Sequence, residues 1–298
     1  MKRFLFAACM VLIFSTYVLA DDVDTSLGDA VSEQLKASTR ATIQAGMDSE
    51  DAVHMTAIMQ QNRFTQELAI RAQEIIRKGL QDGLPYDPIM NKAMEGMAKQ
   101  VQHQNIVEAM EKTRARYAYS YQKAGQLADS KQLRQQLGNT IAQAMTAGLA
   151  QGDVDRIMQR LQTRDMTRDQ LCDLAQESFT TLREMTRLGV DSETGSDVIC
   201  QALEHQYLSR EMRMLRQTFM EQARYGNPDE VAKNYSNAIG QGRSAQSLGL
   251  SSSGASGSGV GGAATGSHGT GGSSQSGSGS SGQSGSGGSG SGGKGGKP

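Results

Sequence analysis

The 298-residue chain contains no tryptophan and only four prolines and three cysteines, and aromatic residues make up 5% of it. Only three of the prolines fall between residues 21 and 250, and no long alternation of β-branched residues occurs there. Proline interrupts helices and β-branched alternation is typical of strands, so this stretch has few helix breakers and no strand signal. Ala, Gln, Arg, Glu, Leu and Met dominate instead, and all of them favour helices. The sequence predicts an all-α body.

A surplus of basic residues is also missing. Lys and Arg number 30 against 31 Asp and Glu, which gives a net charge of −1. The helical body becomes more acidic, about −5, once Lys2, Arg3, Lys294 and Lys297 are set aside with the two ends of the chain. Nucleic-acid binding needs Lys and Arg clustered on one face. We therefore expect no nucleic-acid partner.

Residues 1–20 have the pattern of a secretory signal peptide. Lys2 and Arg3 are followed by an apolar stretch from residue 4 to about 14, and Val18 and Ala20 precede a cleavage site before Asp21. The apolar stretch is shorter than the roughly 20 residues that a membrane span needs, and no later stretch qualifies. We expect an exported chain, periplasmic or secreted, with no transmembrane segment after cleavage.

The end of the chain is almost entirely glycine and serine. Such a segment buries too little apolar surface to offset its ordering entropy, so it is predicted to be disordered. The predicted organisation is a signal peptide at 1–20, a helical lead-in at 21–48, a helical repeat body at 49–240 and a tail at 241–298.

The body shows the spacing of amphipathic helices, as in Val154, Ile157, Met158 and Leu161. Helical runs are predicted to end at Gly46, Gly79, Gly148, Gly189 and Gly226, because glycine supplies the left-handed residue that closes a helix. Short helices are expected near 49–60, 87–98, 153–162, 196–206 and 228–239. Longer helices are expected near 62–78, 103–125, 167–188 and 208–225, with an additional helix near 131–147. This irregular array of helix pairs is typical of an α-solenoid, although a compact bundle remains an alternative.

One segment resembles a known module. Gly83-Leu84-Pro85, Ile89 to Ala93, Glu95-Gly96-Met97-Ala98-Lys99 and Ile106-Val107 are similar to a GLP…EGLAKGV module of uncharacterised exported bacterial helical-repeat proteins. Here Gln100 replaces the glycine after the lysine, and His103 stands where a helix-starting proline is common. The resemblance implies an exported helical protein and transfers no catalytic residue.

Cys172 and Cys200 remain after signal removal, and such a pair is a candidate disulfide in an oxidising compartment. In a plain helical hairpin their axial mismatch would be ~18 Å at 1.5 Å per residue, against the ~7 Å limit for bridged Cα atoms. The alternative is that each cysteine is a small buried hydrophobe. No CxxC motif indicates a redox site.

Methionines are numerous, and Met90, Met94 and Met97 recur at helical spacing. Thioether clusters can bind Cu(I), but Ile89 and Ala93 widen the same face, which favours a core stripe. The four histidines, His54, His103, His205 and His268, are isolated from one another. We expect no metal site and no cofactor.

Sequence signatures of catalysis are lacking as well. The body contains no GxSxG, Walker or GxGxxG motif. Carboxylates interleave with Lys and Arg at helical spacing, which is the pattern of a solvated face; they include Glu108, Glu111, Asp169, Asp173, Glu204 and Glu211. We predict no catalytic residues.

The segment Arg114 to Tyr121 carries the candidate partner surface. Tyr117 and Tyr121 belong to an apolar stripe, whereas Tyr119 projects from a different face close to Arg116. Tyr and Arg are enriched at binding hot spots. Either Arg116 and Tyr119 contact a partner, or this helix is simply covered on two sides.

The leading functional hypothesis is a non-enzymatic envelope protein that binds or scaffolds an envelope protein partner on its stacked helices. The alternatives are a metal-handling protein that uses Met and His, and a hydrolase with a dispersed carboxylate site.

Overall fold

The computed structural model describes residues 23–248 of the chain, and within that range every regular element is a helix. The predicted signal peptide and most of the predicted tail lie outside these residues. After a short helical turn at residues 23–27, the helices are α2 (Glu33–Gln44), α3 (Ser49–Gln61), α4 (Gln66–Gln81), α5 (Asp87–Ala98), α6 (His103–Ala124), α7 (Lys131–Ala147), α8 (Gln151–Gln162), α9 (Arg168–Arg187), α10 (Ser192–Glu204), α11 (Ser209–Gln222), α12 (Pro228–Gly240) and α13 (Ala245–Leu248). The all-α prediction is confirmed.

Several helix ends differ from the prediction. Gly226 does not close α11, which ends at Gln222, and α4 begins at Gln66 rather than near residue 62. Gly79 does not end a helix, because α4 continues through it, and the left-handed residue after α4 is Gly83 with a φ of 73°. A Cβ at Gly79 would lie 2.9 Å from Ile89 Cδ1, so this glycine permits close packing of α4 on α5. Helix α10 begins at Ser192, four residues before the predicted start, because Asp191 caps it by accepting from the Glu193 amide.

The helices form an array in which each packs mainly against its near neighbours in sequence. Helices α2, α4, α6, α7, α9 and α11 contact one another in that order and make a continuous central layer. The covering helices are α3 and α5 in the first half and α8, α10 and α12 in the second half. The described helices therefore stack along the array, and they do not all surround one central core.

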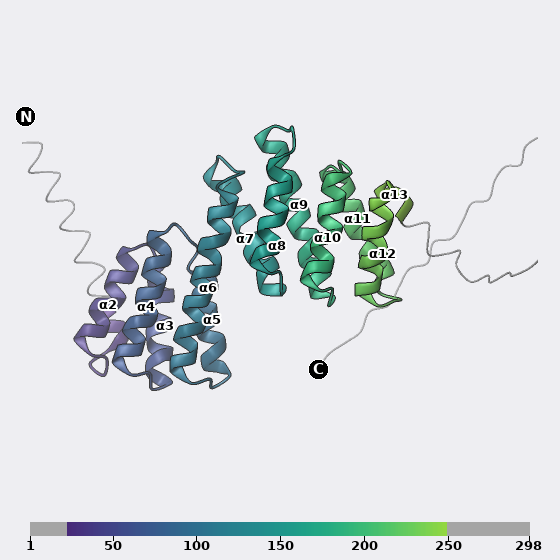
Figure 1. The fold of residues 1–298 in the computed structure, drawn as a ribbon. Coiled ribbons are helices and arrows are strands. Elements are labelled where there is room, and N and C mark those ends of the chain that lie inside the picture. The colour runs from purple at the N-terminus through teal and green to yellow at the C-terminus, as the bar shows by residue number, and fades with distance from the viewer. Residues whose placement is uncertain (1–22, 249–298) are drawn as a thin grey trace, which may run out of the picture. The chain divides into compact units, whose positions relative to one another are not determined.

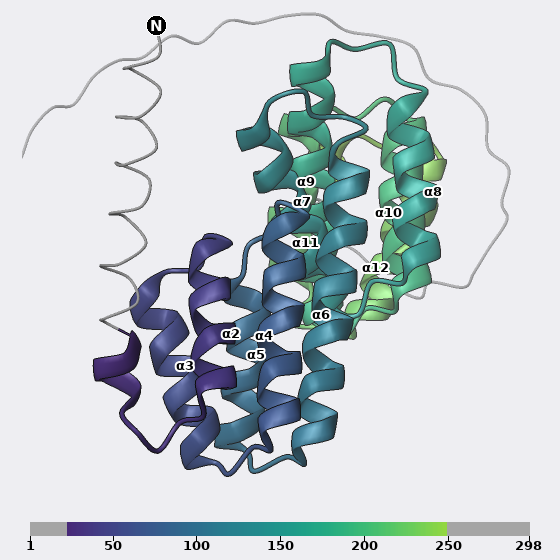
Figure 2. The ribbon, with the colours of Figure 1, turned by 90° about the vertical axis from the view of Figure 1, so that its left-hand side faces the viewer.

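The covering helices change side along the array. Figure 2 shows α3 and α5 on one side of the central layer and α8, α10 and α12 on the opposite side. The change follows from α7, which is the additional helix of the sequence and joins α6 directly within the central layer. One extra antiparallel helix reverses the direction of every later central helix. If the chain keeps the same winding sense, its covering helices must then move to the other side.

The same turn closes eight of the described helices. A residue with positive φ follows the helix, and the next amide donates to the carbonyl five residues earlier, as Leu84 N does to Gly79 O at 2.9 Å. This is the Schellman motif. The positive-φ residues are Gly46, Arg63, Gly83, Gln100, Gly148, Gly189, Gln206 and Gly242. Six of the residues that follow them are buried hydrophobics, namely Met47, Phe64, Leu84, Leu149, Val190 and Tyr207.

Helix α6 belongs to both halves of the core. Its first turns contribute Ile106 and Met110 to the N-terminal core cluster, whereas Ala124 at its end belongs to the C-terminal cluster. Between them Tyr117 and Tyr121 form a small separate cluster with Leu84 and Ala142. The two halves are therefore joined through the middle of α6 and its contact with α7.

Candidate functional site

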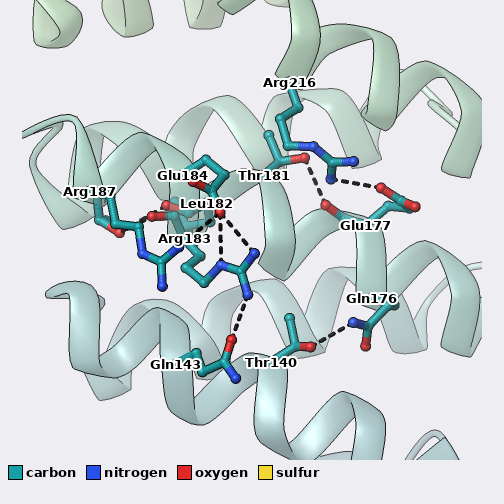
Figure 3. A network of polar contacts seen from close by, with 11 residues as sticks. Thr140, Gln143, Gln176, Glu177, Thr181, Leu182, Arg183, Glu184, Arg187 and Arg216 are labelled. Carbon is teal, nitrogen blue, oxygen red and sulfur yellow. Dashed lines mark hydrogen bonds and ion pairs between the residues drawn. The ribbon is translucent and has the colours of Figure 1, made fainter. Parts of the chain in front are cut away.

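The side of the central layer that α8, α10 and α12 leave uncovered carries a polar network on α7, α9 and α11 (Figure 3). Arg183 donates to Gln143 Oε1 of α7 at 2.6 Å and pairs with Glu184, which also binds Arg187 at 3.3 Å. These contacts hold two guanidinium groups along α9 with only one carboxylate between them.

A second part of the network joins α9 to α11. Glu177 accepts from Arg213 and Arg216, both at 2.7 Å. Burial by itself would raise the pKa of Glu177, yet the hydrogen bonds and charges of the two arginines outweigh burial and lower that pKa. Glu177 is thus ionised at neutral pH, and this face again carries more cations than anions.

Beside this network lies a cleft of about 310 Å³, which we call the junction cleft. It forms where α5, α6, α7 and α9 meet, at the point where the covering helices change side. Its lining includes Pro88, Lys92, Arg116, Tyr117, Gln143 and Arg187. Three of its lining residues are cations and no carboxylate lines it, so the cleft is a positively charged depression on a polar face.

The cations of the junction cleft are partly fixed by neighbours. Arg116 Nη1 donates to Thr146 Oγ1 at 2.8 Å, and Lys92 pairs with Glu95 at 2.5 Å. Arg187 shares Glu184 with Arg183. Their positions are therefore largely set before any ligand arrives, which reduces the entropy lost on binding.

Tyr119 lies in a helix–helix contact and is half-buried. Its hydroxyl is 2.7 Å from Asp155 Oδ1 and 3.1 Å from the Gln151 carbonyl oxygen, and Lys123 Nζ lies 5.2 Å from its ring centroid. Lys123 also pairs with Asp155 at 2.6 Å. Burial first, and then the hydrogen bond to Asp155, raise the pKa of Tyr119.

The two residues predicted from the sequence as one partner surface therefore have different surroundings. Arg116 lines the junction cleft, whereas Tyr119 ties α6 to α8. Helix α6 packs against α5, and its residues Tyr119 and Lys123 contact Asp155 of α8. Lys92 and Arg187 were not predicted, because only the stacking of distant helices brings them to Arg116.

The candidate disulfide is not formed. Cys172 and Cys200 are both free and buried in the structure. Cys172 lies about four turns before the end of α9 and Cys200 about two turns after the start of α10, an axial mismatch of ~10 Å. Burial raises the pKa of Cys200 to about 11, so its thiol is protonated and unreactive.

The methionines of the sequence stripe are part of the core. Met90, Met97, Met55 and Met59 are buried, and Met94 packs against the same cluster. Of the histidines, His54 and His205 are exposed and His103 stacks on Phe64 at 4.1 Å, while His268 lies outside the described residues. No group of three or more His, Cys, Asp or Glu within residues 23–248 is arranged to hold a metal ion.

Three of the carboxylates singled out in the sequence have structural partners. Glu111 binds Arg114, whose hydrogen bond lowers the pKa of Glu111. Glu204 pairs with Arg160, and Glu211 caps α11 by accepting from the Leu208 amide at 2.9 Å. Each of these three carboxylates is therefore held by its own structural partner.

No helix in the described part of the chain is long and apolar enough to cross a membrane. The chain matches no model of a protein family, and neither the curated proteins nor the solved structures that were compared with it include a significant match.

Proposed function

We propose that the chain is a non-enzymatic, exported helical-repeat protein that binds an acidic segment of an envelope protein. The observation that carries the proposal is the junction cleft, which Lys92, Arg116 and Arg187 line without a carboxylate. The signal-peptide pattern of residues 1–20 supports the cellular compartment.

The cleft opens on the uncovered face of α7, α9 and α11, which extends the potential contact area. Arg183, Arg213 and Arg216 stand along that face, opposed by Glu177 and Glu184. A surface of this kind attracts an acidic partner over a Debye length of about 8–10 Å and orients it before contact. The cleft then takes one acidic side chain, for which the arginines supply bidentate donors.

The test is a pull-down from native envelope material with the exported chain as bait, followed by affinity measurement on the recovered partner. The variant Arg116→Ser/Arg187→Ser should retain its fold and bind the partner at least tenfold more weakly. Binding of the unmodified chain should also fall steeply between 50 and 300 mM salt, as expected of ~2–3 charge pairs.

The matched control is Arg160→Ser/Arg168→Ser, which removes the same charge from exposed positions outside the cleft. We expect this control to bind almost like the unmodified chain. Equal losses in the two double variants would show a nonspecific charge effect and contradict the proposal. The proposal would also be contradicted if the affinity of the partner changed neither with salt concentration nor in the cleft variant Arg116→Ser/Arg187→Ser.

A further inference from the structure

A second depression lies at the C-terminal end of the described helices, between α11, α12 and the segment that leads into α13. It has a volume of about 770 Å³, within the usual range for small-molecule sites. Val231, Tyr235, Ala238 and Leu248 form its apolar part. We call it the C-terminal groove.

Uncharged polar side chains surround that apolar part. Four carboxamides line the groove, namely Gln222, Asn234, Asn237 and Gln241. The lining contains one acidic residue, Glu221, and one basic residue, Arg243, so its net charge is zero. The C-terminal groove therefore differs from the junction cleft, whose lining is cationic, and fits a neutral ligand.

Two tyrosines of the groove have features that packing leaves unexplained. Tyr225 is 93% exposed at the rim, far more than any other large hydrophobic side chain among residues 23–248. Tyr235 is 3% exposed and packs edge-on against Phe219, yet its buried hydroxyl has no hydrogen-bond partner among the described residues. An unpaired buried hydroxyl is energetically unfavourable, and a ligand hydroxyl that paired with it would remove that cost.

We propose that the C-terminal groove binds a neutral oligosaccharide. Each carboxamide carries both donors and acceptors, which match sugar hydroxyls that donate and accept in turn. The apolar CH face of a sugar ring packs on an exposed aromatic ring, and Tyr225 offers such a ring at the rim. Tyr235, whose hydroxyl is unpaired, also lines the groove.

The experiment titrates the full exported chain with chitotetraose and, separately, with maltotetraose. Calorimetry gives the affinity, and tyrosine fluorescence reports the site because the chain has no tryptophan. Saturable binding of either sugar supports the proposal, and the preferred sugar shows whether acetamido groups are recognised. Failure of both sugars to bind at millimolar concentration overturns it.

Tyr225→Ala locates the site. Because Tyr225 is almost fully exposed, the substitution should leave the unfolding transition unchanged and weaken sugar binding about tenfold or more. The control is Arg224→Ala, at the neighbouring exposed position outside the groove, which should bind normally. If the sugar binds Tyr225→Ala and the unmodified chain with equal affinity, its site does not include Tyr225 and the assignment is refuted.

Tyr235→Phe provides an independent readout. Removal of an unpaired buried hydroxyl should leave stability equal or slightly higher, whereas sugar binding should weaken several-fold. Unchanged binding in this variant would contradict the role given to the hydroxyl.

Sedimentation completes the test: a dimer of the unmodified chain that Tyr225→Ala converts to monomer would identify the groove as an interface between copies and overturn the proposal. Loss of sugar binding with intact binding of the acidic envelope partner would separate this site from the junction cleft.

Discussion

A methyl group at Gly138 of α7 would lie only 2.5 Å from Cδ2 of Tyr121 on α6. The Tyr121 ring is held in place, because its hydroxyl lies 2.9 Å from Asn139 Oδ1 and the side chain is 8% exposed. This close approach occurs between the two consecutive helices of the central layer, where the covering helices change side. The additional helix α7, which makes the array irregular, therefore carries a glycine that allows it to pack against α6.

We predict that Gly138→Ala destabilises the protein although alanine favours helix. The helix preference of alanine over glycine is worth about 1 kcal/mol, whereas overpacking a fixed ring costs about 1–3 kcal/mol. Urea unfolding should give a net loss of up to about 2 kcal/mol. The control is Gly152→Ala on α8, where nothing lies within 4 Å of the new Cβ and stability should rise slightly. If both substitutions stabilise the protein, the Tyr121 ring moves aside without cost and the prediction is wrong.

The sequence predicted the helices better than the contacts between them. Apolar spacing and capping residues placed the helices 87–98 and 131–147 at the bounds of α5 and α7. Gly79 was misassigned because a second glycine, Gly83, lies one turn later, and the sequence does not reveal which of the two has positive φ.

The candidate site was harder to predict for a physical reason. Lys92 and Arg187 meet in the junction cleft only because α7 reverses the central layer and moves the covering helices to the other side. No local pattern records that change. Arg116 was found from its tyrosine-rich surroundings, but those surroundings gave Tyr119 the same role, and the structure separates the two residues.

We predict that Gln100→Gly stabilises the protein. Gln100 has a φ of 54° in the turn after α5, a conformation that costs a residue with a side chain about 1 kcal/mol relative to glycine. Thermal and urea unfolding should show a gain of about 0.5–1 kcal/mol, offset in part by the greater freedom of the unfolded chain. The control is Gln104→Gly: Gln104 lies within α6, so this substitution should lower the stability of the protein. A loss of stability in both variants would show that the backbone at Gln100 is not strained.

The ion pairs of Glu177 predict a pH dependence. Its pKa is lower in the folded chain than in the unfolded chain, where it is near 4.3. The group therefore contributes stability above pH ~4.3, and this contribution is lost as the pH falls through the lower folded pKa. Glu177→Gln should lower the melting temperature at pH 7, and its difference from the unmodified chain should shrink as the pH falls below ~4.3. Glu108→Gln, at an exposed position on α6, should show little difference throughout. A Glu177→Gln difference that does not shrink as the pH falls would contradict the assignment.

The final prediction separates Tyr119 from Arg116. Tyr119→Phe keeps the ring and removes the hydroxyl that bonds Asp155 and the Gln151 carbonyl, so unfolding should require about 1 kcal/mol less. Asp155 retains Lys123 as a partner, which limits the loss. Arg116→Ser removes a single bond to Thr146 from a partly exposed side chain and should cost less than this in stability. Binding of the envelope partner should show the reverse order, because Arg116 lines the junction cleft and Tyr119 does not. A partner that loses more affinity with Tyr119→Phe than with Arg116→Ser would move the binding surface from the cleft to the contact between α6 and α8.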